Sequence, residues 1–183
     1  MGTKARNIRT THTKQSLINA FMQLVNEKDF EKITVADLTD RALVNRATFY
    51  AHFNDKHELL DYIVVNSAST VIANRTSGAA KFDHDSIKQL VLAVCDFHQP
   101  PNIQCRRSYL NLIPLLKKKM LTALKAYLSE GVDASLTGSE KDFYVPMYAS
   151  MILEAGYLWA TGQVALDKEE IAERVSLLVA GNC

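Results

Sequence analysis

The chain has 183 residues, of which 48% are hydrophobic and 22% are charged, a composition typical of a globular protein with a sizeable core. This excludes a mainly disordered chain, and the length fits one domain or two small domains that share a core. Seven glycines and four prolines are few for short strands and tight turns, so helices are favoured over a β-sandwich or barrel, while 21 basic and 20 acidic residues leave a net charge of +1 that indicates no class of partner.

Several classes of site are disfavoured. The three cysteines, Cys95, Cys105 and Cys183, are odd in number and lack metal-like spacing, which argues against a disulfide framework or a zinc site and fits a reducing compartment. No apolar run approaches the roughly 18–20 residues of a membrane helix, and the polar N-terminus is not a signal peptide. We therefore expect a cytoplasmic protein with no cofactor, no metal and no membrane partner.

The first residues are locally basic. Four basic side chains precede the first acidic residue, Glu27, namely Lys4, Arg6, Arg9 and Lys14. Such a segment can neutralise phosphates, although a solvated tail has the same composition. We expect a flexible basic arm over residues 1–10.

Hydrophobic periodicity and capping residues predict the helices in chain order. An apolar stripe from Leu17 to Val25 predicts a helix over 11–27. Thr34 and Asp37 have the spacing of a capping box and open a helix over 34–41. Asn45 is a good N-cap for a helix over 45–52. Further helices are expected over 55–75, 84–98, 102–113, 114–129, 142–163 and 168–180. With no alternating strand pattern, the sequence predicts an all-α chain of about nine helices.

The helices over 34–41 and 45–52 are short, and a turn of three or four residues joins them. This is the helix-turn-helix arrangement, whose second helix enters the major groove of DNA. Phe49 and Phe53 are four residues apart and should be core, so the opposite face carries the polar and small side chains, namely Arg46, Ala47, Thr48, Tyr50 and His52. Arginine can bind guanine, threonine can donate or accept, and alanine can contact a thymine methyl group.

Residues 33–60 resemble the DNA-binding domain of the TetR family of transcriptional regulators. The resemblance rests on the run Thr48-Phe49-Tyr50 and on Phe53, Lys56 and Leu59-Leu60. It implies an N-terminal helix-turn-helix domain over 11–65, with its fourth helix as a link, and a larger C-terminal ligand-binding and dimerisation domain over 66–183.

The resemblance also assigns roles to residues. Thr34, Val35 and Asn45 would lie at the DNA, Arg46, Ala47 and Thr48 would read bases, and Tyr50, His52 and Lys56 would hold phosphates. Each assignment has an alternative, since Thr34 can be only a cap, Tyr50 can pack on the first helix, and Lys56 can be a solvated lysine. At Leu43 the family usually has glycine, which serves a left-handed or crowded backbone position.

The C-terminal half is less specific. The segment 142–163 is apolar on more than one face, more than a surface helix needs. It contains small residues, among them Gly156, that would let another helix approach. We expect it to be buried on two sides, one of them a homodimer interface formed with 168–180, although a central core helix in a monomer has the same pattern.

The sequence therefore predicts a homodimeric regulator of the TetR type that binds double-stranded DNA at a palindromic operator. The resemblance implies a repressor released by an unidentified small-molecule effector. The alternative is a regulator of the same fold that has no such effector and acts through a protein partner, as a coactivator does. An enzyme is not expected, because no nucleophilic triad, metal cluster or phosphate loop is visible.

Overall fold

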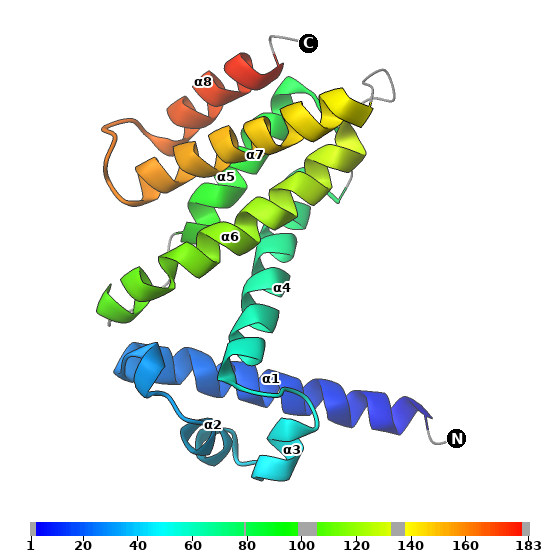
Figure 1. Cartoon of the computed structure of the whole chain (residues 1–183), viewed down its shortest axis with the longest axis vertical. Helices are drawn as coiled ribbons and strands as arrows, with labels where there is room; N and C mark the ends of the chain where they lie inside the picture. The colour runs from blue at the N-terminus through cyan, green and yellow to red at the C-terminus, as the bar shows by residue number, and fades with distance from the viewer. Residues whose placement is uncertain (1–2, 79, 99–105, 133–137, 181–183) are drawn as a thin grey trace. The chain divides into compact units, whose positions relative to one another are not determined.

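The computed structural model describes residues 3–78, 80–98, 106–132 and 138–180, with side chains for all of these except 3–11 and 106–111. Over these residues the chain is all-helical, which confirms the predicted class (Figure 1). The elements are α1 (Thr3–Glu27), the 3₁₀ turn η1 (Phe30–Lys32), α2 (Val35–Ala42), α3 (Arg46–Tyr50), α4 (Lys56–Thr76), α5 (His84–His98), α6 (Arg106–Gly131), α7 (Gly138–Ala160) and α8 (Lys168–Ala180).

The first helix is longer than expected. The segment over residues 1–10 was expected to be a flexible arm, but α1 already begins at Thr3. No glycine or proline lies between Thr3 and Glu27, so no strong helix breaker separates the basic segment from the amphipathic helix that follows it. The basic segment therefore extends a helix.

The helices predicted over 102–113 and 114–129 are one helix, α6, with Pro114 inside it. Residues 102–105 of that prediction lie outside the described residues. Proline fixes φ near the helical value and removes one hydrogen bond, so a helix can continue past it at a cost. This merger makes the described α-helices eight, close to the expected number.

The chain divides into two compact units. One comprises residues 1–63 with 102–114, and the other comprises 64–101 with 115–183. From the sequence we expected domains over 11–65 and 66–183, and the sequence does not predict that 102–114 group with the first unit.

In the first unit, α1 packs against α2, and α2 packs against α3. The predicted apolar stripe of α1 is buried, with Leu17 fully so. Leu38 of α2 and Phe49 of α3 are also fully buried. This core fixes α3 on the rest of the unit and leaves its other side to the solvent.

In the second unit, α5 packs against both α7 and α8 (Figure 1). The α5 side chains from Leu90 to Cys95 are almost entirely buried. Gly156 of α7 faces α5 of the same chain, because a Cβ atom there would lie 2.5 Å from Val94 Cγ1. Gly156 was expected among the small residues that let another helix approach. The approaching helix is α5, so this residue belongs to the protomer core.

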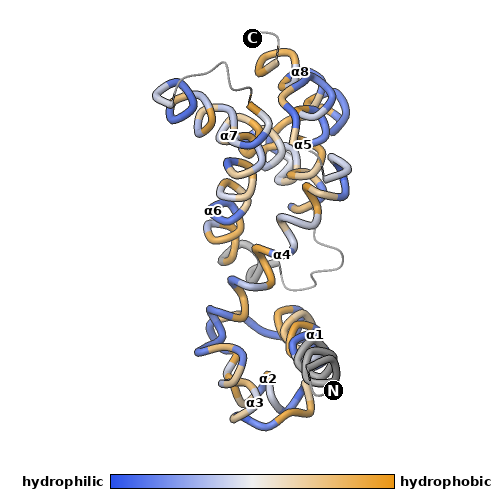
Figure 2. The backbone as a smooth tube through the Cα atoms, turned by 90° about the vertical axis from the view of Figure 1, so that its right-hand side faces the viewer, coloured by the Kyte–Doolittle hydropathy of each residue, from blue (hydrophilic) through white to orange (hydrophobic). Residues whose placement is uncertain are grey.

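Six large apolar side chains of the last two helices are exposed. They are Phe143, Tyr144, Met147 and Met151 of α7, with Leu177 and Leu178 of α8. The last turn of α8, beside the C-terminus, is correspondingly coloured as hydrophobic in Figure 2. We call these six residues the α7–α8 apolar face.

Cys95 is a buried side chain of α5, and burial raises the pKa of its thiol to about 12. A thiol that stays protonated is a poor nucleophile. Cys95 is therefore best described as a core residue and not as a reactive thiol. Cys105 and Cys183 lie outside the described residues. Over the described part of the chain, none of the helices has the length and apolarity needed to cross a lipid bilayer.

Candidate nucleic-acid interface

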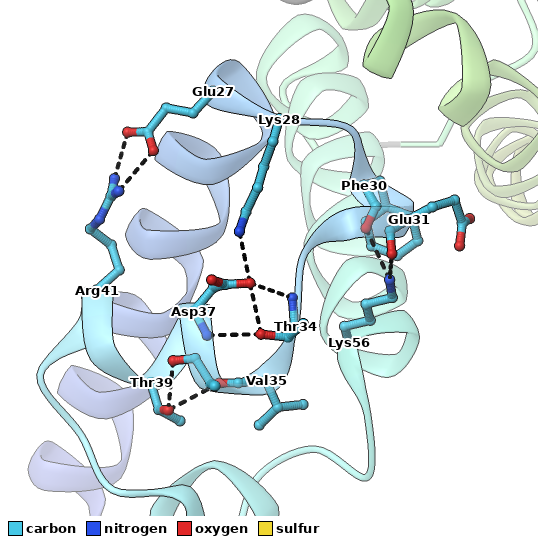
Figure 3. A network of polar contacts seen from close by, with 11 residues as sticks. Glu27, Lys28, Phe30, Glu31, Thr34, Val35, Asp37, Thr39, Arg41 and Lys56 are labelled. Carbon is cyan, nitrogen blue, oxygen red and sulfur yellow. Dashed lines mark hydrogen bonds and ion pairs between the residues drawn. The ribbon is translucent and has the colours of Figure 1, made fainter.

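The start of α2 is fixed by the predicted capping box (Figure 3). Thr34 Oγ1 accepts a hydrogen bond from the backbone N–H of Asp37 at 3.1 Å, and Asp37 Oδ2 accepts from the backbone N–H of Thr34 at 2.7 Å. Lys28 Nζ lies 2.8 Å from the same carboxylate oxygen. The hydrogen bond from Lys28, with those from Thr34, lowers the pKa of Asp37 to about 2. Asp37 is therefore ionised over the physiological range and ties α2 to the end of α1.

A second ion pair joins the same two helices. The guanidinium of Arg41 donates to both carboxylate oxygens of Glu27, at 2.7 and 2.8 Å (Figure 3). The hydrogen bond from Arg41 lowers the pKa of Glu27. The fork geometry restrains rotation of α2 more than a single contact would. Together, the Arg41–Glu27 and Lys28–Asp37 ion pairs hold α2 against α1, and α3 packs against α2.

The turn between α2 and α3 contains a left-handed residue. Leu43 has φ 55° and ψ 42° and is 91% exposed. Glycine adopts this conformation without steric strain, whereas a residue with a Cβ atom does not. The position is therefore one that suits glycine, the residue that the resemblance leads us to expect there, and in this chain leucine occupies it.

Helix α3 is short, and its buried and exposed sides match the sequence prediction. Phe49 is fully buried and Phe53 nearly so, with their ring centroids 6.0 Å apart. Arg46 and Ala47 are exposed, and Tyr50 is 55% exposed with its ring set edge-on against Phe49. The helix itself ends at Tyr50, two residues earlier than predicted.

The remaining predicted residues near α2 and α3 differ in exposure. Thr48, His52 and Val35 are half-buried, whereas Thr34 and Asn45 are exposed N-caps of α2 and α3. Thr39, which the sequence reading did not single out, is buried and donates its hydroxyl to the carbonyl oxygens of Val35 and Ala36. The structure thus brings eight of the nine predicted residues to α2, α3 and their caps or the turn just after α3.

The ninth predicted residue, Lys56 of α4, has contacts within the chain. Its Nζ donates to the carbonyl oxygens of Phe30 and Glu31, both at 2.9 Å, and lies 4.6 Å from the centre of the Phe30 ring (Figure 3). These contacts bind α4 to η1. Sequence reasoning missed them because carbonyl groups of a distant turn leave no signal in residue types. Two of the three ammonium donors are used in this way, which leaves one for a phosphate.

Lys14, part of the basic segment, also has a partner in the first unit. Its ammonium lies 4.7 Å from the centre of the Tyr62 ring and 5.8 Å from that of Phe53. Cations are attracted to the faces of aromatic rings at such distances. Lys14 therefore ties α1 to α4, and the other basic side chains of this segment lie outside the described side chains.

Taken together, the exposed side of α3 and its caps offers hydrogen-bond donors and small side chains from a rigid support. This is suited to reading base edges in a major groove, where donors, acceptors and methyl groups distinguish the base pairs. Among the residues described, no cluster of histidine, cysteine or carboxylate side chains could hold a metal ion.

Comparison with known proteins agrees with this geometry. Residues 17–63 match the family model described as bacterial regulatory proteins, tetR family. An uncharacterised HTH-type transcriptional regulator of Bacillus subtilis, YxbF, is 28% identical over 153 residues, which are 79% of this chain and 38% of that protein. The HTH-type dhaKLM operon transcriptional activator DhaS of Lactococcus lactis is 32% identical over 60 residues, or 33% of this chain and 32% of that protein.

The matched parts span about a third of the length of these curated relatives. Among solved structures, a TetR transcriptional regulator from Streptococcus agalactiae has a TM-score of 0.58 and 20% identity, with 98% of this chain and 99% of that chain covered. At that identity the likeness shows a common fold.

Proposed function

Because the chain belongs to the TetR family of bacterial regulatory proteins through its N-terminal helix-turn-helix, we propose that it is a homodimeric repressor that binds a palindromic operator and is released by a small-molecule effector. The observation that carries this proposal is the division of α3 into a buried aromatic side and an exposed polar side. An exposed recognition helix on a rigid core is what sequence-specific binding requires.

The proposed DNA contacts follow the exposure of the side chains. Arg46 and Ala47 are exposed at the start of α3 and would read base edges together with Thr48. Tyr50, His52 and the third donor of Lys56 would bind phosphate oxygens. Thr34 and Val35, at the start of α2, would lie against the DNA backbone. Phosphate contacts set the register of the protein, and base contacts set its sequence preference.

The proposed dimer uses the α7–α8 apolar face. Exposed large apolar side chains favour association, because covering them removes them from water. With a twofold axis at this face, the α7–α8 apolar face of one protomer would pack against the same face of its partner, which is an isologous interface. Two recognition helices would then read two half-sites.

Release by an effector requires that the effector bind two conformations of the protein with different affinity. Only that difference can change the affinity for DNA. We propose that such a site lies in the second unit, since α3 and its support would bind DNA.

A second candidate is a regulator of the same fold that acts through a protein partner and has no small-molecule effector. It is favoured by one relative, the DhaS protein, which is named as an operon activator. The two candidates are distinguished by measuring the melting temperature of the protein in the presence of small-molecule extracts and, separately, of protein fractions. A bound small-molecule effector raises the melting temperature as its concentration rises.

The proposal is tested by incubating the protein with fragments of genomic DNA at two salt concentrations and sequencing the fragments that it binds. We expect enrichment of a palindrome and a steep loss of affinity at the higher salt, since phosphate contacts release counterions. Salt-sensitive binding that enriches no sequence would contradict sequence-specific regulation by this protein.

A further inference from the structure

Five side chains of α4 and α5 line an open hollow of about 490 Å³ in the second unit, which we call the α4–α5 hollow. Val71, Asn74 and Arg75 lie on one face of α4, at positions i, i+3 and i+4, and Gln89 and Asp96 are two turns apart on α5. Cavities that hold small organic molecules have volumes of roughly 300–1,000 Å³. The hollow has the size of a small-molecule site, and its lining is mostly polar.

The ion pair at the hollow uses only one edge of the Arg75 guanidinium. Nε donates to Asp96 Oδ2 at 2.8 Å, and Nη2 donates to the same oxygen. A guanidinium has five N–H donors in a fixed planar arrangement, and over the described residues Arg75 makes no other hydrogen bond. Its second edge, formed by Nη1 and Nη2, therefore keeps two parallel N–H donors, and the side chain is partly exposed.

The charges at the hollow favour an anion. Asp96 Oδ2 faces Arg75, and Asp96 Oδ1 lies 3.6 Å from Nζ of Lys168 in α8, so one carboxylate lies between two cations. The amides of Asn74 and Gln89 add further N–H donors, and in the described part of the chain neither amide donates to another group. The hollow thus combines free donors with one net positive charge, which suits a monovalent anion.

We propose that the α4–α5 hollow binds the carboxylate of a small organic acid, and that the effector of the proposed repressor is such an acid. A carboxylate is planar, and its two oxygens match the parallel N–H groups of Nη1 and Nη2 in a bidentate pair. Asn74 and Gln89 donate to polar atoms of the acid, and Val71 is its apolar contact. The effector part rests on the proposed function, whereas the binding part does not need DNA.

The binding part is tested by measuring the melting temperature of the full chain with acetate, benzoate or succinate at rising concentration. Acetamide and benzamide are matched neutral probes, and sodium chloride corrects for ionic strength. We expect a carboxylate to raise the melting temperature, as a ligand of the folded protein does, and the amides to leave it unchanged. No rise with any of these carboxylates, or an equal rise with inorganic phosphate, would overturn the proposal.

Two variants break the same ion pair but differ in what they leave for the ligand. Arg75→Gln removes the guanidinium and should raise the dissociation constant of the carboxylate at least about tenfold. Asp96→Asn keeps the guanidinium and removes a neighbouring negative charge, so it should bind the carboxylate at least as tightly as the wild-type chain. Equal loss of binding in both variants would make Arg75 a structural residue and overturn the site, as would unchanged binding by Arg75→Gln.

Gln89→Ala keeps the test available if either ion-pair variant fails to fold, because it breaks no hydrogen bond within the described chain. It should weaken carboxylate binding without lowering the melting temperature of the free protein. Unchanged binding by this variant would remove Gln89 from the site.

The effector part is tested by adding the same carboxylate to the protein bound at its selected DNA site. We expect the wild-type chain to release the DNA and Arg75→Gln to retain it. A carboxylate that binds without changing the affinity for DNA would overturn the effector part. If the wild-type chain selects no DNA site, the proposed function fails, and the melting temperatures still decide whether the hollow binds carboxylates.

Discussion

At the scale of single residues, Leu43 has a strained backbone conformation that the surrounding fold maintains. It has the left-handed backbone of a position suited to glycine, and its side chain is almost fully exposed. The left-handed conformation costs about 1–2 kcal/mol for a residue with a Cβ atom. Because the Leu43 side chain is almost fully exposed, it gains little hydrophobic stabilisation to offset that cost. The neighbouring helices and their ion pairs hold the turn in place.

We predict that Leu43→Gly stabilises the first unit by about 1 kcal/mol, since relief of strain exceeds the added flexibility of the unfolded chain. Urea unfolding, followed by a probe in this unit, would show a higher midpoint at unchanged slope. Ala42→Gly, one residue earlier and at the last position of α2, is the control and should destabilise the unit by up to about 1 kcal/mol. A lower midpoint for Leu43→Gly would show that the leucine side chain stabilises the turn.

Lys56 is the residue at which a structural and a functional role coincide. Its contacts with Phe30 and Glu31 are visible, and its phosphate contact is proposed. We predict that Lys56→Met lowers the affinity for all DNA sequences alike and reduces the slope of log K against log salt by about 0.9, the value for one phosphate contact. Lys118→Met, an exposed change on α6, should leave the slope unchanged. Lower stability with an unaltered slope would make Lys56 a structural residue only.

At the scale of elements, the sequence predicts the helices whose signals are local. The capping box of Thr34 and Asp37 and the N-cap at Asn45 place α2 and α3 to within about two residues. Pro114 misled the prediction, because proline favours the start of a helix without excluding its interior. The contacts of Lys56 and Gly156 join segments distant in the chain, and residue spacing carries no information about them.

The α7–α8 apolar face leads to a prediction about assembly. Met147 is exposed at the centre of the apolar residues of α7, so Met147→Asp places a charge in the proposed interface and should convert the dimer to monomers. Thr122→Asp, an exposed change on α6, carries the same charge and should remain dimeric. Sedimentation velocity distinguishes the two states. A dimeric Met147→Asp protein would place the interface elsewhere.

Substitution of Gly156 cannot test the dimer interface, although the small size of this residue suggested that another helix approaches it. Any larger side chain there would collide with Val94 inside the protomer, so its variants would report on folding of the second unit.

At the scale of the whole molecule, we propose that the two units have separate tasks. The first unit holds the exposed side of α3 on a core stabilised by the α1–α2 ion pairs. The second unit is proposed to hold two chains together at the α7–α8 apolar face. Pairing of this kind makes the spacing of the two half-sites a property of the dimer, and a twofold axis makes the operator a palindrome.

The central claim is tested most directly by measuring affinity for the selected site as the separation of its half-sites is varied. We expect tight binding when the half-site centres are about one helical turn, roughly 34 Å, apart, because two recognition helices then meet the same side of the duplex. We expect a large loss of affinity when about half a turn of DNA is inserted or one half-site is removed. Equal affinity for a single half-site and for every spacing would contradict a dimeric regulator that reads a palindrome.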